Sequence, residues 1–284
     1  MDIGEYKVTA IETGQFALDG GAMFGVVPRT MWEKKVVPDD RNRIPMALRV
    51  MLIQGHGRNI LVDTGIGEKW STRETAIYAI DFEKNSLKFG LLKSGLRVED
   101  ITDVILTHLH FDHAGGATKV SNLGVLEPTF PNAKYYVQAQ NLQWAKRPVE
   151  KDRASYLPHD FEPLLAHGVL ETIDGPGELF PGIGVRLSQG HTAGLQIPVI
   201  SDGVTTLVYP ADLIPTRAHV PVPWVMAYDL RPVVSVAEKK ALYARAVPNR
   251  WILFYEHDAV VAASYVVSGE RGFEAGETVD VSVP

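Results

Sequence analysis

The sequence predicts a mixed α/β fold rich in antiparallel sheet, formed by a single domain over residues 1–284. Short apolar stretches typical of strands are interleaved with charged helical stretches, and this order recurs in both halves of the chain. No low-complexity linker separates the halves. A length of 284 residues with 45% apolar content suits one large core, or two domains at most.

The first half is predicted to begin with strands and to end with a short helix. Residues 47–55 and 59–65 flank a short turn and are therefore expected to form a hairpin. Residues 66–95 carry many charges among scattered apolar positions, which indicates helices at the surface. Further strands are expected at 6–14, 101–106 and 133–138, with a helix at 139–147 before Pro148.

The second half repeats this order of strands and helix. Strands are predicted at 185–190, 196–201 and 205–212, with glycine-containing turns between them. Residues 235–247 are expected to form a helix, in which Ser235 is the N-cap and Glu238 completes a capping box. The stretch 251–258 is predicted to be the last strand, and His257 lies at its end.

Composition and charge exclude several classes of function. The net charge is −6 and no basic run is present, so we expect no nucleic-acid partner. The longest apolar runs are strand-sized, far below the roughly 18 residues of a membrane-spanning helix. The N-terminus lacks a basic start followed by an apolar block, so we expect a cytoplasmic protein. Without cysteine, disulfides, thiolate metal sites and a cysteine nucleophile are excluded.

The most informative motif is "THLHFDHAGG" at 107–116, which follows the predicted strand at 101–106. Residues two apart in an extended segment point the same way, so His108 and His110 are expected to bind one ion. Asp112 and His113 lie in the next turn, within reach of a second ion. A catalytic zinc usually has about three protein ligands, so four in this motif predict a pair of ions.

The remaining ligands are expected at other strand ends. His191, Asp212 and His257 each follow a predicted strand of the second half. Histidines outside these positions look ordinary, as exposed loop residues: they are His56, His159 and His167. His219 lies shortly after Asp212 and is a candidate for the pocket wall.

In order along the chain, these motifs resemble the metallo-β-lactamase superfamily, and so does "LVDTG" at 61–65. The resemblance covers nearly the whole chain and implies a four-layer αββα sandwich with two metal ions at the mouth between its sheets. By analogy, one ion would be held by His108, His110 and His191. The other would be held by Asp112, His113 and His257, with Asp212 bridging the two ions. Asp63 would position the metal loop.

Such a site implies hydrolysis of an ester-like bond. Two divalent ions that share a water lower its pKa from about 15.7 to near neutrality, and the bridging hydroxide is then the nucleophile. Asp112 would pass a proton to the leaving alkoxide, as is proposed for related lactonases. Nitrogen and oxygen ligands discriminate weakly between metals, so Zn²⁺ is expected first, with Fe, Co or Mn as alternatives.

Two further stretches bear on the substrate. Residues 18–32 and 215–232 resemble segments of the YtnP-like branch of N-acyl homoserine lactonases, which are quorum-quenching enzymes with side activity on organophosphates. The resemblance implies opening of the lactone ring of N-acyl homoserine lactones. Because the second stretch is shared loosely with methyl parathion hydrolases, a phosphotriesterase or arylesterase is the alternative. A non-catalytic binding protein of this fold is the third reading, although no ligand residue is missing.

Large side chains in these stretches are candidates for the wall of an acyl-chain pocket. They are Met23, Phe24, Trp32, Trp224 and Met226. The same side chains would also suit a packed core or a subunit interface. Some lactonases place a tyrosine three residues after the bridging aspartate, where it hydrogen-bonds the lactone carbonyl, but this chain has Pro215 there. Tyr228 or His219 is the candidate donor instead.

The N-terminal loop, about residues 15–45, is expected to contribute to the pocket or to a dimer interface. Because related lactonases are often dimers, the resemblance implies a homodimer, with a small-molecule lactone or ester as the other partner.

Overall fold

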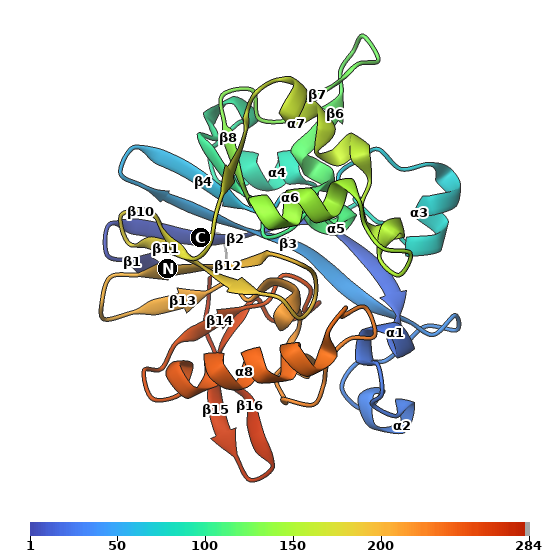
Figure 1. The fold of residues 1–284 in the computed structure, drawn as a ribbon, viewed down its shortest axis with the longest axis vertical. Coiled ribbons are helices and arrows are strands. Elements are labelled where there is room, and N and C mark those ends of the chain that lie inside the picture. The colour runs from blue at the N-terminus through green and yellow to red at the C-terminus, as the bar shows by residue number, and fades with distance from the viewer. Residues whose placement is uncertain (282–284) are drawn as a thin grey trace.

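The computed structural model describes residues 1–281. Within this range the strands form two seven-stranded sheets and a separate two-stranded hairpin (Figure 1). The first sheet runs in the order β1 (Asp2–Ile3), β2 (Tyr6–Asp19), β3 (Arg43–Gly55), β4 (Arg58–Val62), β5 (Asp103–Ile105), β8 (Lys134–Gln138) and β9 (Leu170–Ile173). It is antiparallel from β1 to β4 and parallel from β4 to β9.

The second sheet follows chain order. It contains β10 (Gly177–Phe180), β11 (Ile183–Ser188), β12 (Leu195–Ser201), β13 (Thr206–Val208), β14 (Ile252–Phe254), β15 (Ala263–Gly269) and β16 (Gly272–Thr278). All its neighbours are antiparallel except β13 and β14, which are parallel. The small hairpin is β6 (Thr118–Val120) with β7 (Leu126–Pro128).

Helices are mostly short. The α-helices are α1 (Gly20–Phe24), α2 (Arg29–Trp32), α3 (Thr72–Tyr78), α4 (Leu87–Lys93), α5 (Phe111–Ala114), α6 (Ala139–Lys146), α7 (Glu162–Ala166) and α8 (Pro232–Ala246). The 3₁₀ helices are η1 (Val98–Asp100), η2 (Gly115–Ala117), η3 (Arg153–Ser155), η4 (Pro158–Asp160), η5 (Ala211–Leu213) and η6 (Arg217–His219).

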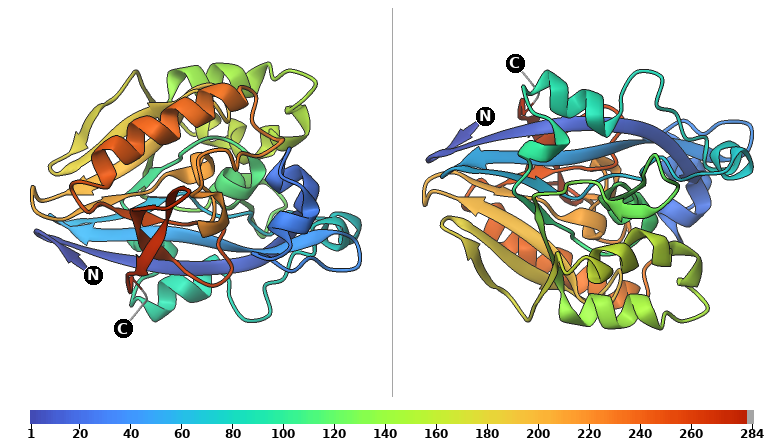
Figure 2. Two further views of the ribbon diagram at one scale, coloured as in Figure 1. Left: turned by 90° about the horizontal axis from the view of Figure 1, so that it is seen from below. Right: turned by 90° about the horizontal axis from the view of Figure 1, so that it is seen from above.

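The two sheets face each other and helices cover their outer surfaces, as the two views of Figure 2 show for α4 and α8. Successive side chains of β3 point to opposite faces of the first sheet, and each face packs against a different layer. Met51 and Ile53 belong to the core between the sheets, which also contains Ile197 of β12. Val50 and Leu52 point the other way, into a second core that contains Leu91 of α4. The predicted αββα sandwich is therefore confirmed, as is the hairpin, in which β3 pairs with β4.

The predicted capping box at α8 is wrong. The helix begins one turn earlier, with Pro232 at its first position and Arg231 as N-cap. Proline suits this position because it has no N–H to leave unpaired. The carboxylate of Glu238 is engaged elsewhere, since it accepts hydrogen bonds from Ser188 Oγ at 2.6 Å and from the backbone N–H of Gln189 at 2.7 Å. It therefore fixes the loop ahead of His191.

The strand predicted at 251–258 is present, but it is shorter than expected and is not the last strand of the chain. Only Ile252–Phe254 forms β14, and β15 and β16 follow it as an antiparallel pair at the edge of the second sheet. Apolar and polar residues alternate only weakly along these two strands. β16 lies at the edge of the sheet, and none of its residues is fully buried. The period-two pattern that marks a half-buried strand is therefore faint in this segment.

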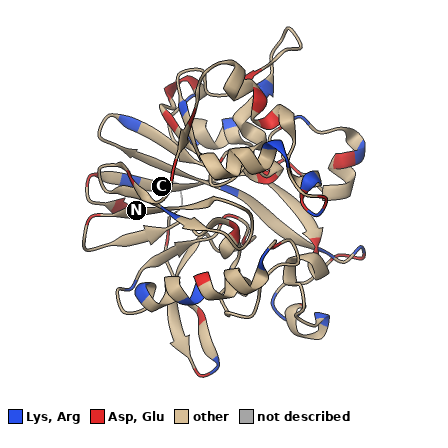
Figure 3. Ribbon diagram, viewed as in Figure 1, with Lys and Arg blue, Asp and Glu red and all other residues tan. Residues whose placement is uncertain are grey.

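Charges are distributed over many elements, with Lys, Arg, Asp and Glu interspersed along the ribbon (Figure 3). Among residues 1–281, no helix is both long and apolar enough to span a membrane.

Candidate metal centre

The metal loop is fixed by Asp63, which directly follows β4. The strands β4 and β5 are parallel, so residues that follow them meet at one edge of the sheet. The Asp63 carboxylate accepts hydrogen bonds from Thr107 N at 2.7 Å and Thr107 Oγ1 at 2.8 Å. It also accepts one from His113 Nδ1 at 2.9 Å. Asp63 thereby holds both ends of the loop that carries the histidines.

Glycines after the motif allow a close approach of two backbone segments. A Cβ at Gly115 would lie 2.2 Å from the carbonyl oxygen of Ile66, and one at Gly116 would lie 2.2 Å from that of Thr64. Any larger residue would push the loop away from the segment after β4. The glycine pair of "HAGG" is therefore a packing requirement for the position of α5.

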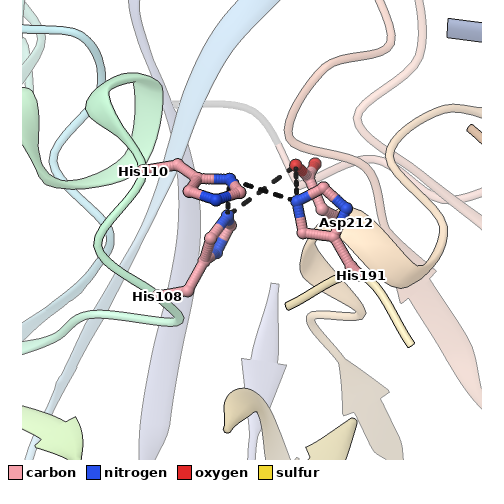
Figure 4. A group of neighbouring side chains, drawn as sticks. All are labelled: His108, His110, His191 and Asp212. Atoms are coloured by element: carbon pink, nitrogen blue, oxygen red, sulfur yellow. Dashed lines mark hydrogen bonds and ion pairs between the residues drawn. The ribbon is translucent and has the colours of Figure 1, made fainter. Parts of the chain in front are cut away.

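The first cluster consists of His108, His110, His191 and Asp212, whose ligand atoms lie within 4.8 Å of one another (Figure 4). His108 Nε2 is 3.0 Å from His110 Nδ1. His191 Nε2 is 3.2 Å from His110 Nδ1 and 3.0 Å from Asp212 Oδ2. All four side chains are buried, and their ring and carboxylate atoms converge on one another.

The second cluster shares Asp212 with the first. It consists of His113, Asp212, Glu256 and His257, again within 4.8 Å of one another. His113 Nε2 is 3.4 Å from His257 Nε2 and 3.5 Å from Asp212 Oδ2. Asp112 lies at the edge of this group, with Oδ2 3.5 Å from His257 Nε2. The geometry brings together all seven predicted ligands and adds Glu256.

The chemistry of these side chains fits metal ions. Burial and the neighbouring imidazoles hold the pKa of His108 well below its usual value, and burial does the same for His110. Both rings are therefore neutral and have a lone pair to donate. Asp212 Oδ1 is buried without a hydrogen-bond partner among the described residues. Buried polar atoms without partners are rare, and a bound cation would satisfy them.

Neighbouring acceptors orient three of the rings. His191 Nδ1 faces Asp229 Oδ1 at 3.0 Å, and His257 Nδ1 faces the carbonyl of Ala47 at 2.9 Å. Asp63 contacts Nδ1 of His113 in the same way. In each of the three rings Nδ1 is therefore hydrogen-bonded, and Nε2 points toward the centre. Such contacts set the tautomer and orientation of metal-binding histidines.

A cavity of about 160 Å³ opens onto the two clusters. Three predicted pocket residues line it, namely Met23, Met226 and Tyr228. Burial and the nearby carboxylate of Asp112 raise the pKa of Tyr228, so its hydroxyl keeps its proton. The other apolar and aromatic residues that line the cavity are Leu18, Met46, Tyr78, Phe111 and Ala154.

The other predicted wall residues are not part of this lining. Phe24 stacks on Trp32 and meets Trp224 edge-on, in a cluster behind the wall. His219 also lies there, because its ring stacks on Phe24 at a centroid distance of 4.8 Å. Its two nitrogens are engaged by Thr216 Oγ1 and by the carbonyl of Met23. His219 therefore supports the Met23 segment and has no free donor to offer a substrate.

Glu256, Tyr78 and Asp229 were not foreseen from the sequence. Glu256 directly precedes His257, and an acidic residue beside a ligand gives little indication of where it points. Tyr78 ends a charged helix that was expected to lie at the surface, although it packs on Phe111 of α5. Asp229 lies 38 positions from His191, and nothing in its local pattern predicts their contact.

Comparison with known proteins agrees with this geometry. Residues 48–257 match the family model described as "Metallo-beta-lactamase superfamily". The chain belongs to the metallo-β-lactamase superfamily. This match confirms the family, the fold and the expectation of an enzyme that the sequence motifs suggested.

The chain is similar to an N-acyl homoserine lactonase in sequence and to two hydrolases of known structure. An N-acyl homoserine lactonase of Bacillus cereus is 25% identical over 229 residues, which cover 76% of this chain and 83% of the relative. A probable metal-dependent hydrolase from Staphylococcus aureus is 29% identical with a TM-score of 0.88, and the match covers 99% of this chain and 100% of that one. AidC, a dizinc quorum-quenching lactonase, shares the fold at 23% identity with a TM-score of 0.80, over 99% and 97% of the two chains.

Proposed function

We propose that this metallo-β-lactamase superfamily protein is a two-metal lactonase that opens the ring of N-acyl homoserine lactones. The observation that carries the proposal is the pair of ligand clusters that share Asp212 beneath a cavity with an apolar wall. Curated relatives that are named N-acyl homoserine lactonases, at 25 to 28% identity, favour this substrate over other esters.

The clusters would hold two divalent ions, with Zn²⁺ first and Fe, Co or Mn as alternatives. Such ions supply a water of lowered pKa as nucleophile and polarise the ester carbonyl. His108, His110 and His191 would hold one ion, and Asp112, His113 and His257 the other, with Asp212 between them.

Two side chains have the position for proton transfer and carbonyl binding. Asp112 borders both the second cluster and the cavity, where it can take a proton from the attacking water and pass it to the leaving alkoxide. Tyr228 lines the same cavity with a protonated hydroxyl that can donate a hydrogen bond to the lactone carbonyl. Because Pro215 has no donor and His219 has both nitrogens engaged, Tyr228 is the candidate that we retain.

The apolar side of the cavity suits an acyl chain. Met23 and Met226 meet there with Leu18, and methionine adapts its shape to chains of different length. The N-terminal loop contributes two of these side chains. The loop also carries exposed Val26, Met31 and Val37, so we also propose that it pairs with a second copy of the chain.

Parallel kinetics on two substrate classes test the function. We expect kcat/KM for a C6–C12 N-acyl homoserine lactone above about 10⁴ M⁻¹s⁻¹, the lower limit of ordinary enzyme efficiency. Paraoxon should be turned over far more slowly. Lactone turnover below about 10³ M⁻¹s⁻¹ together with faster paraoxon hydrolysis would instead favour the phosphotriesterase alternative.

A further inference from the structure

Glu256 is a buried carboxylate without an assigned role in the ligand set above. It is 2% exposed, and both its oxygens lack a hydrogen-bond donor among the described residues. Burying a charged group without a partner is costly, so a carboxylate in this position needs either a cation nearby or a proton. Its ion-pair partners among the described residues are His113 and His257 of the second cluster.

The position of Glu256 relative to that cluster is specific. Its Oε1 is 3.7 Å from His257 Nε2, and its Oε2 is 3.4 Å from His113 Nδ1. One of its oxygens lies within 4.8 Å of ligand atoms from His113, Asp212 and His257. Its Oε1 therefore borders the space that the second ion would occupy, whereas its Oε2 lies beside the His113 nitrogen that Asp63 binds. Glu256 is not part of the lining of the substrate cavity.

The two ion sites consequently differ in their donors. Three imidazoles and the shared Asp212 surround the first site. The second has two imidazoles, the shared Asp212, Asp112 at its edge, and Glu256. Imidazole suits Zn²⁺ and its neighbours in the periodic table, whereas carboxylate oxygen suits harder ions such as Mn²⁺.

We propose that Glu256 is an additional carboxylate of the second ion site and that it shifts this site toward harder divalent cations than the first. This inference rests on the proposed two-metal centre. It assigns to this chain an asymmetric pair of sites, in which the ratio of Mn²⁺ to Zn²⁺ affinity is higher at the second site.

Metal titration of Glu256→Gln tests the proposal, because the amide keeps the size of the side chain and removes its charge. Chelator-treated protein is reloaded with Zn²⁺ or Mn²⁺, and both bound equivalents are measured by calorimetry and by elemental analysis. The first Zn²⁺ should bind as in the wild type. The second ion should bind about 10- to 100-fold more weakly, as for other residues that support metal ligands, with a larger loss for Mn²⁺ than for Zn²⁺.

Glu256→Asp and Asp103→Asn complete the design. Glu256→Asp retains the charge and should recover part of the Mn²⁺ affinity. Asp103 is a second buried carboxylate, paired with Arg58 at the opposite end of β5. Its replacement removes a buried charge away from the clusters, so both metal affinities should match the wild type.

Thermal unfolding separates a metal-binding role from a structural one. Without metal, Glu256→Gln should unfold near the wild-type temperature, because neither carboxylate oxygen has a hydrogen-bond donor that the substitution would leave unpaired. Saturation with metal should then raise its midpoint less than that of the wild type. A loss of stability without metal, or wild-type affinity for both ions, would overturn the role of Glu256. A wild-type chain that binds fewer than two ions would overturn the two-metal centre itself, which is a different result.

Discussion

Asp63→Asn is the perturbation that examines the support of the metal loop most closely. Asp63 has a φ of 60°, a left-handed conformation that asparagine tolerates, so the substitution adds little backbone strain. The amide oxygen can still accept the hydrogen bond from Thr107 N. The amide nitrogen can donate to Thr107 Oγ1, but it cannot accept from His113 Nδ1.

The magnitude follows from the bond that is lost. One buried hydrogen bond to a charged group contributes about 1.5 to 3 kcal/mol, so the free energy of unfolding should fall by about 2 kcal/mol. His113 also loses the partner that orients its ring, and the affinity for the second ion should fall about 10- to 100-fold. Urea denaturation measures the first effect, and metal titration measures the second.

Asp103→Asn again serves as the matched control. Asp103 is buried and accepts hydrogen bonds from Arg58 and Tyr136, so its loss should also destabilise the protein. It should leave metal affinity unchanged, since β5 separates it from the centre. If Asp63→Asn kept wild-type affinity for both ions, the assignment of Asp63 as the support of the metal loop would be refuted.

Three further substitutions probe other parts of the account. His110→Ala should lose an ion and lower the activity by more than about 100-fold, a larger effect than replacing a residue that only hydrogen-bonds a ligand. Full activity would contradict the ligand assignment. Tyr228→Phe should lower kcat by about 10- to 100-fold, somewhat less than for a fully buried carbonyl donor, with little change in metal content; an unchanged kcat would exclude the hydroxyl as donor. Lys239→Met should cost about 3 kcal/mol in urea denaturation, because Lys239 Nζ donates to the carbonyls of His219, Pro221 and Trp224; wild-type stability would contradict that role.

The sequence predicted the parts of the centre that lie in one dense motif or at strand ends. His108, His110 and His113 follow a buried strand, where so many imidazoles have few structural uses. Glu256 and Asp229 were not predicted, because their positions in the centre depend on contacts between distant segments. Periodicity and spacing report on local structure only, and such contacts become visible only once both sheets are assembled.

One short pattern shows how tertiary context decides a local prediction. Ser-x-x-Glu occurs at Ser71 and Glu74, where it forms a capping box at the start of α3. It occurs again at Ser235 and Glu238, where it does not, because Pro232 starts α8 earlier and Glu238 binds the loop before His191. The same motif thus caps a helix in one place and fixes the loop before a predicted metal ligand in the other.

The pocket wall was predicted only in part, for a similar reason. Met23 and Met226 line the cavity, whereas Phe24, Trp32 and Trp224 pack behind it. Side-chain size and apolarity identify residues that will be buried. They do not distinguish a wall from the core that supports it, because both need large apolar groups.

The most direct test of the central claim is lactone turnover measured during stepwise reloading of metal-free protein with Zn²⁺. We expect hydrolysis of N-hexanoyl homoserine lactone to rise steeply as the second equivalent binds and to level off at two ions per chain. Full activity at one ion per chain, or no lactone hydrolysis at two, would contradict a two-metal lactonase.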